Sequence, residues 1–351
     1  MSSLNANHSL GGEPLCCNGN QEKRPLLRGE VPQPASTSVI SRRDIASDGT
    51  TAIIQIPLPA PERAEPRYKP EKLKTLVAFL WSSLCLIANL FVLAYIHERV
   101  PPRTVAPLPD IFFDIFPVVD RALDVSEIII IASVWTCILL IILHRYRWIV
   151  FRRVSIIMGS LYAMRAITML VTQVPVASTT YFCSPKANST SLSVIFQRVL
   201  KLYTGFGLSI NGQHTYCGDY IFSGHTLILT MCFLIVKEYS PQRCRILHIL
   251  FFCTSCTGVF LVLLARGHYT IDVILGYYVT TRVFWIYHSL CASQLSTKTH
   301  LSSQTAVSYL SRVWWYPLFL YFEKNVTGPV PRQYEWPLPW PRKWLPRSRI
   351  S

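Results

Sequence analysis

The sequence predicts an all-α, polytopic membrane protein with six transmembrane helices and both termini in the cytosol. Of its 351 residues, 50% are hydrophobic and only 15% are charged, whereas soluble domains carry about 25% charged residues. The apolar residues gather in six runs, close to the roughly 20 residues that cross a bilayer. The runs are Thr75–Ile96, Ile128–Leu143, Val154–Val174, Ile221–Val236, Ile246–Ala265 and Ile271–Leu290.

The distribution of Lys and Arg orients these helices. The tail up to Lys74 has ten, the short loops His144–Arg153 and Lys237–Arg245 have four and three, and the C-terminal tail has eight. The long loops 97–127 and 173–220 have only three each. Because cytosolic loops carry the excess of basic residues, both tails and both short loops are predicted to be cytosolic. The net charge of +15 therefore marks topology, and we expect no nucleic-acid partner.

The chain divides into three predicted parts. Residues 1–72 form a cytosolic tail rich in Pro, Gly, Ser and Arg, without a helical or strand period, and are expected to be largely disordered. Residues 73–292 form the six-helix transmembrane domain. Residues 293–351 alternate aromatic and basic residues, which favour the membrane interface and the anionic inner leaflet. This cytosolic tail is expected to lie along the membrane surface. The two three-helix halves of the transmembrane domain show no internal repeat, which argues against an inverted-repeat transporter.

Two loop features suggest covalent modification. Cys183 and Cys217 are the one cysteine pair in the same lumenal loop, where a disulfide is permitted, and we expect them to be bridged. Asn188 opens a glycosylation sequon in that loop. Cys16 and Cys17 in the cytosolic tail are either acylated or free thiols, and the sequence favours neither.

Two histidine segments carry the chemistry. The segment 217–226 reads C-G-D-Y-I-F-S-G-H-T and opens the fourth span, and the segment 268–272 reads H-Y-T-I-D and opens the sixth. Both spans begin on the lumenal or extracellular side in the predicted topology. His225, His268 and Asp272 are therefore expected at the same face of the membrane, although nothing in the local motifs requires that agreement.

These residue types suit phosphoryl transfer without a metal or cofactor. His268 and Asp272 are four residues apart, so the carboxylate can orient the imidazole and leave its other nitrogen free to attack. His225 can then act as acid or base on the opposite side of the reacting centre. The backbone amides of Ser223 and Gly224, near a helix start, can hold a phosphate oxygen. A single interfacial histidine is usually only a polar side chain, but the combination favours catalysis.

Two arginines lie near the middle of predicted spans. Arg165 and Arg282 each need a partner or a wet cavity, since a central arginine costs at least ~2.5 kcal/mol on insertion scales. A structural ion pair is the favoured interpretation for Arg282. For Arg165, an ion pair and attraction of a lipid phosphate remain equally open. Arg165 and Asp219 join Ser223 and Gly224 as candidate substrate-binding residues.

The segments 217–226 and 268–273 resemble the two catalytic motifs of the sphingomyelin synthases, members of the lipid phosphate phosphatase superfamily. The resemblance covers roughly residues 75–340. It implies transfer of phosphocholine from phosphatidylcholine to ceramide, giving sphingomyelin and diacylglycerol. It further implies that His268, helped by Asp272, attacks phosphorus and forms a phosphohistidine-type intermediate, while His225 protonates the leaving oxygen. It places the site at the lumenal or extracellular face of the Golgi or plasma membrane, and leaves open a homo-oligomer.

Departures from the family pattern keep two alternatives open. Val262 stands where the phosphatases of the superfamily carry an arginine, which argues against a generic lipid phosphatase. Gly267 stands where many synthases carry an acidic residue, so a ceramide phosphoethanolamine synthase using phosphatidylethanolamine is the alternative. The short N-terminal tail leaves no room for the extra domain that such enzymes often carry, which favours phosphatidylcholine. A non-catalytic lipid-binding or transport protein is the third hypothesis.

Overall fold

The computed structural model describes residues 41–45, 51–55, 68–102, 104–178, 183–186, 192–205, 216–299, 309–326 and 329–337, and the chain separates into two units, Met1–Pro66 and Arg67–Ser351. The first unit contains an antiparallel pair of strands, β1 (Ser41–Ile45) and β2 (Thr51–Gln55). No strand is predicted here from the sequence, although β2 carries three β-branched residues, which favour strands. Residues 68–72 of the predicted tail are also described, and its other residues lie outside the described part.

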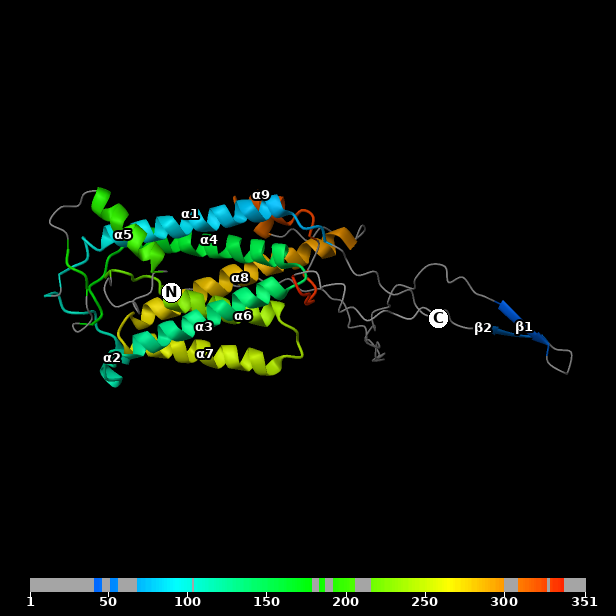
Figure 1. Ribbon diagram of the computed structural model, residues 1–351, viewed down its shortest axis with the longest axis horizontal. Helices are drawn as coiled ribbons and strands as arrows, with labels where there is room; N and C mark the ends of the chain where they lie inside the picture. Colours follow the sequence, from blue (N-terminus) through cyan, green and yellow to red (C-terminus); the bar gives the residue numbers. More distant parts are fainter. Residues whose placement is uncertain are drawn as a thin grey trace, which may run out of the picture. The chain divides into compact units, whose positions relative to one another are not determined.

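In the described part of the second unit, every regular element is a helix, as the sequence predicts. The helices are α1 (Lys72–Ile96), α2 (Ile111–Ile115), α3 (Ala122–Leu143), α4 (Arg147–Val171), α5 (Leu192–Thr204), α6 (Gly224–Tyr239), α7 (Arg245–Leu264), α8 (Thr270–Thr299), the 3-10 helix η1 (Tyr309–Arg312) and α9 (Tyr316–Glu323). The long helices form a bundle in which α1 packs on α4, α4 on α8, α8 on α6, and α6 on both α3 and α7. Helices α2 and α5 lie at one end of this bundle, and α9 lies at the other (Figure 1).

Each of the six predicted spans coincides with one long helix of the bundle. Four of these helices, α1, α3, α4 and α7, are long and apolar enough to cross a membrane. Helix α6 has 16 residues and α8 has 30, and crossings by these two remain a prediction. The chain is thus a membrane protein with at least four helices fit to span the bilayer, and the orientation of its ends stays a prediction.

The basic loop predicted at His144–Arg153 is wrong over most of its length, because α4 already begins at Arg147. Arg152 and Arg153 are only 0% and 1% exposed. Arg153 pairs with Glu323 of α9 at 2.7 Å, and Arg152 pairs at 2.9 Å with Glu71, at the start of α1. Burial acts to raise the pKa of the Glu323 carboxyl, but the two guanidinium groups hold it below its usual range. Distant carboxylates thus let these arginines continue the helix into the bundle.

Part of the C-terminal tail, which the sequence predicts to lie along the membrane surface, packs into the bundle. Phe319 and Phe322 of α9 are buried and belong to the main hydrophobic core. The hydroxyl of Tyr287 on α8 donates a hydrogen bond of 2.9 Å to Glu323. The ion pairs of Glu323 and these aromatic contacts fasten α9 to α4 and α8, at the end of the bundle where α1 begins.

Close helix packing depends on a small residue at one contact. A Cβ atom added to Gly159 of α4 would lie 2.7 Å from the indole of Trp81 on α1. Only glycine fits there without displacing the ring. Small residues of this kind let transmembrane helices approach each other, and α1 and α4 form the most extensive helix pair of the bundle.

Candidate active site

The two histidine segments meet at the end of the bundle where α6 and α8 begin, which we call the histidine end. His225 lies in the first turn of α6, and His268 lies two residues before α8. His268 Nε2 is 3.4 Å from His225 Nδ1. The His268 side chain is 3% exposed and that of His225 is 17% exposed. The structure thus brings together, from two helices, the imidazoles that the sequence analysis placed at one face.

Asp272 lies on the far side of His268 and is held firmly. Its carboxylate accepts hydrogen bonds from the backbone N–H groups of Ile221 at 3.0 Å and Tyr269 at 3.1 Å. Asp272 Oδ2 is 3.8 Å from His268 Nδ1, which is beyond hydrogen-bond range. Catalytic hydrogen bonds are often long before substrate binds, and a small rotation of the imidazole would close this gap.

Glu127 lies beside His225, on the side away from His268, and it is not among the residues predicted for the site. Its carboxylate lies 3.7 Å from His225 Nε2 and is buried on α3. The predicted second span begins one residue later, at Ile128, which assigns Glu127 to the preceding loop. The sequence signal that could have identified this residue is its position as an acidic residue directly before an apolar run. Within the described residues, His225 Nε2 and His268 Nδ1 are buried without a hydrogen-bond partner. Each imidazole therefore turns one nitrogen toward the other ring and one toward a carboxylate.

Burial sets the protonation state of His268. Removal from water lowers the pKa of this imidazole to about 4, although Asp272 nearby acts to raise it. The ring is therefore neutral at neutral pH and keeps a lone pair for attack, as a nucleophilic histidine requires. No group of three or more His, Cys, Asp or Glu side chains is arranged to hold a metal ion in the described parts of the chain.

The start of α8, which carries His268, is fixed by Asp110 from the α2 segment. The carboxylate of Asp110 accepts hydrogen bonds of 2.8 Å from both the backbone N–H and the hydroxyl of Thr270. The ring of Tyr220 approaches the His268 imidazole edge-on, with centroids 6.0 Å apart. Tyr220 in turn accepts a hydrogen bond of 3.0 Å from the Ala177 N–H. These contacts fix the backbone at the start of α8, from which the His268 side chain extends.

Arg165 is buried beneath the loop that leads into α6. Its Nε donates to the Phe222 carbonyl at 3.0 Å, one terminal nitrogen donates to Asn89 of α1 at 3.1 Å, and the other pairs with Asp219. Of the two open interpretations, the structure thus shows the ion pair, although the partner belongs to a loop and not to a helix. The guanidinium also packs on Gly224, where an added Cβ would lie 3.0 Å from it. Arg165 therefore holds the backbone that presents His225.

The groups of Ser223 are engaged within the protein. Its hydroxyl caps α6 by accepting a hydrogen bond of 3.2 Å from the Thr226 N–H. Its own N–H donates to the Asp272 carbonyl at 3.2 Å. That amide thus links α6 to α8, and the predicted phosphate contact by it would require this hydrogen bond to open. Gly224, at the first position of α6, remains the candidate for such a contact.

Arg282 does not form the expected ion pair. Its guanidinium lies on the outer surface of α8, over the rings of Tyr278 at 5.1 Å and Trp285 at 5.6 Å. No carboxylate pairs with Arg282 among the residues that the structure describes. Cation–π contacts with two aromatic rings replace the ion pair that the sequence analysis favoured.

A disulfide braces the loop in front of the site. Cys183 and Cys217 are joined, with Cα atoms 5.6 Å apart. The Cys217 N–H donates to His97 Nδ1 at 2.9 Å, and His97 Nε2 lies 3.1 Å from the Ser184 carbonyl. Because Nδ1 accepts, the proton sits on Nε2 and donates to Ser184. His97, at the end of α1, thus contacts the chain on both sides of the disulfide. Asn188 lies outside the described residues.

We expect Cys217→Ser to destabilise the protein by about 2–4 kcal/mol, since the bridge closes a long loop. The unfolding temperature of the purified protein in detergent should fall, whereas Cys244→Ser, at an exposed free cysteine, should leave it unchanged. Peptide mapping without reductant checks the bridge directly, and finding both thiols free would reject it.

Comparison with known proteins identifies relatives. Residues 216–289, which include both histidines, match a family described as PAP2 superfamily C-terminal. The chain is 45% identical over 299 residues to phosphatidylcholine:ceramide cholinephosphotransferase 1 of Rattus norvegicus, covering 84% of this chain and 69% of that protein. The Homo sapiens counterpart is 44% identical over 299 residues, covering 84% and 70%. Phosphatidylcholine:ceramide cholinephosphotransferase 2 of Mus musculus is 45% identical over 289 residues, covering 82% and 77%.

Proposed function

Because this chain belongs to the phosphatidylcholine:ceramide cholinephosphotransferase, or sphingomyelin synthase, family, we propose that its histidine end moves phosphocholine from phosphatidylcholine to ceramide through a covalent histidine intermediate. The chain is a transferase of sphingolipid metabolism. The observation that carries the proposed mechanism is the row Asp272–His268–His225–Glu127, with two facing imidazoles and a carboxylate behind each.

In the first half-reaction, Nε2 of neutral His268 attacks the phosphorus of phosphatidylcholine. The bond from phosphorus to the glycerol oxygen breaks, and protonated His225 gives its proton to that oxygen, so diacylglycerol leaves. Asp272 stabilises the positive charge that develops on the His268 ring. The Glu127 carboxylate lies 3.7 Å from His225 Nε2 and faces the ring that carries this proton.

In the second half-reaction, the primary hydroxyl of ceramide replaces diacylglycerol. His225, now neutral, takes the hydroxyl proton as the oxygen attacks phosphorus. The bond between phosphorus and His268 breaks, sphingomyelin leaves, and both histidines return to their first state. The 3.4 Å contact between the imidazoles leaves no room for a phosphoryl group, so the rings must move apart when the donor binds.

The acceptor must be a lipid alcohol and not water, and the burial of His268 supports this selectivity. A site that excludes water protects a reactive intermediate from hydrolysis. The distribution of basic residues supports a lumenal or extracellular histidine end with both termini cytosolic. The Golgi and the plasma membrane both offer such a face. The similar identity to cholinephosphotransferases 1 and 2 does not favour either compartment.

The lowered pKa of His268 predicts the acid limb of the pH profile. The transfer rate should stay high as pH falls through 6.5 and decline only toward about pH 4, where a proton occupies the nucleophilic nitrogen. The contribution of His268 to the stability of the fold depends on pH in the same direction. It is fully present above about pH 6.5 and is lost as pH falls toward about 4, because over this range His268 binds a proton in the unfolded chain but not in the folded one. Initial rates of the detergent-purified enzyme check this, and an acid limb near pH 6.5 would contradict it.

Arg165→Lys tests whether the guanidinium positions the site. Lysine keeps the charge but cannot reach Phe222, Asn89 and Asp219 together. Charge-assisted hydrogen bonds are worth about 1.5–3 kcal/mol each, so we expect kcat to fall roughly 10- to 100-fold as the α6 start loosens. KM should change much less. Normal folding with unchanged kinetics would count against a positioning role.

One assay decides the donor. The purified enzyme receives fluorescent ceramide with either phosphatidylcholine or phosphatidylethanolamine, and the product is identified by mass. Sphingomyelin from phosphatidylcholine supports the proposal. Ceramide phosphoethanolamine as the main product would assign the alternative donor, for which Gly267 is the one observation in favour. No product from either donor would support the non-catalytic hypothesis.

A further inference from the structure

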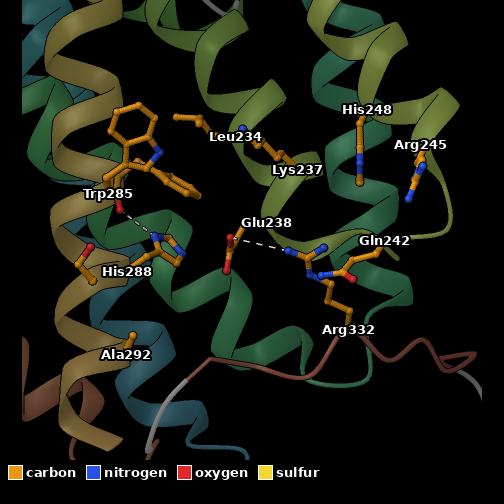
Figure 2. A pocket seen from close by; sticks show the side chains of 12 residues that line it. Leu234, Lys237, Glu238, Gln242, Arg245, His248, Trp285, His288, Ala292 and Arg332 are labelled. Atoms are coloured by element: carbon orange, nitrogen blue, oxygen red, sulfur yellow. Dashed lines mark hydrogen bonds and ion pairs between the residues drawn. The ribbon is translucent and has the colours of Figure 1, made fainter. Parts of the chain in front are cut away.

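A cavity of about 630 Å³ lies at the end of the bundle opposite the histidine end. The last turn of α6, the first turns of α7, the second half of α8 and the segment around Arg332 surround it (Figure 2). Lys237 in its wall follows His225 along α6 by 12 residues, which corresponds to about 18 Å of helix. The cavity is therefore separate from the reacting histidines, and the proposed reaction does not use it.

The cavity carries a surplus of positive charge. Lys237, Arg245 and Arg332 line it, and Glu238 is its one lining carboxylate. The Glu238 carboxylate lies 4.0 Å from a terminal nitrogen of Arg332, a loose ion pair that Figure 2 shows as a dashed line. Two positive charges remain after this pair is counted. Helices that meet around such a basic pocket near a membrane interface are suited to anionic lipid headgroups.

The start of α7 adds to this positive potential. The helix begins at Arg245, and its N-cap residue Cys244 makes no side-chain cap hydrogen bond. The first N–H groups of a helix have no partner within the helix, and the helix dipole is positive at that end. A phosphate bound beside Arg245 would therefore meet both a guanidinium and the favourable end of a 20-residue helix.

The remaining walls suit an amphiphilic ligand larger than phosphate. Gln242 and Ser289 offer neutral polar groups, while Phe284 and Trp285 form an apolar side. Trp285 is exposed on the outer surface of α8, so this side is open toward the lipid. His288 contributes only a ring wall, because its two nitrogens already contact the Tyr239 hydroxyl and the Phe284 carbonyl, both at 2.8 Å. The volume falls within the range of small-molecule sites.

We propose that this cavity binds the phosphorylated polyol headgroup of an anionic membrane lipid. The phosphate lies between Arg245, Arg332 and Lys237, and the polyol hydroxyls meet Gln242 and Ser289. The acyl chains leave past Trp285 into the bilayer. A water-soluble phosphorylated polyol presents the same headgroup chemistry without the chains, so the test must separate the two sources.

The test uses the full-length protein in phosphatidylcholine nanodiscs that contain a phosphatidylinositol monophosphate. Native mass spectrometry counts the lipid that stays bound. We expect one phosphoinositide per chain, with affinity reduced at least ~10-fold in the double variant Arg245→Gln, Arg332→Gln, which loses two charge-assisted contacts. Arg243→Gln removes one positive charge from an exposed loop position that does not line the cavity and should bind like the wild type.

Unchanged binding by the double variant would overturn the proposal, and so would equal binding of phosphatidylserine, which lacks the phosphorylated polyol. The water-soluble glycerophosphoinositol phosphate is the second arm: displacement of the lipid at equal affinity would assign the cavity to a soluble ligand. An unchanged unfolding temperature shows that the double variant folds. Lys237→Gln, at an exposed side chain, replaces it if it does not, with a smaller loss of affinity expected.

Discussion

Replacing His268 with alanine is expected to reduce the rate of phosphocholine transfer by roughly 10⁴-fold or more while the protein still folds. The substitution removes the nitrogen that attacks phosphorus, and no other described side chain offers a neutral buried imidazole next to both Asp272 and His225. Rates are measured with fluorescent ceramide and phosphatidylcholine on protein purified in detergent.

Folding of the His268→Ala variant is checked by its unfolding temperature. His268 Nδ1 has no hydrogen-bond partner in the described structure, so its loss should leave little else unsatisfied. Full activity of this variant would reject the mechanism. If His268→Ala loses both activity and the folded state, His268→Gln becomes the test of the mechanism. Glutamine fills more of the space that the imidazole occupies, and this variant should fold and be equally inactive.

Replacing Glu323 with alanine is expected to have the largest effect on folding. Glu323 is buried between Arg153 and Arg152 and accepts the Tyr287 hydroxyl hydrogen bond. Removing one partner from a buried charge network leaves the others uncompensated and costs about 3–5 kcal/mol. We therefore expect a large fall in unfolding temperature or a loss of folded protein on purification.

Glu335→Ala is the matched control for Glu323→Ala. The Glu335 side chain is 65% exposed and lies 3.9 Å from Arg145, and an exposed ion pair of this kind contributes about 0–1 kcal/mol. Equal unfolding temperatures for the two variants would show that the Glu323 network does not hold α9 and α4 together.

The long helices could be predicted because they depend on a local pattern, and the shared face of His225 and His268 because the basic loops orient the spans. Apolar runs located every long helix, and the spacing of His268 and Asp272 indicated that the two belong to one face. The sequence predicts the start of α6 three residues early, at Ile221, because hydropathy does not register the cap that the Ser223 hydroxyl provides by accepting from the Thr226 N–H. Helix boundaries at polar caps need hydrogen bonds that an apolar run does not reveal.

Two of the remaining errors share a cause, which is pairing between residues far apart in the chain. Arg152 and Arg153 look like loop residues until Glu323, 170 positions from Arg153, neutralises them. Glu127 looks like a loop carboxylate until α6 brings His225 against it. Arg282 differs from these residues: it pairs with no carboxylate among the described residues, and its guanidinium lies over aromatic rings of its own helix. A single sequence contains these residues but does not contain their distances.

The most direct test of the mechanism is to look for phosphocholine on His268. The enzyme is incubated with phosphatidylcholine labelled in its choline methyl groups, without ceramide, then quenched in alkali and digested for peptide mass spectrometry. The account predicts labelled phosphocholine on the peptide that contains His268, its disappearance when ceramide is added, and its absence in His268→Ala. Transfer that proceeds at the normal rate while the label is found on another residue, or on none, would contradict the account.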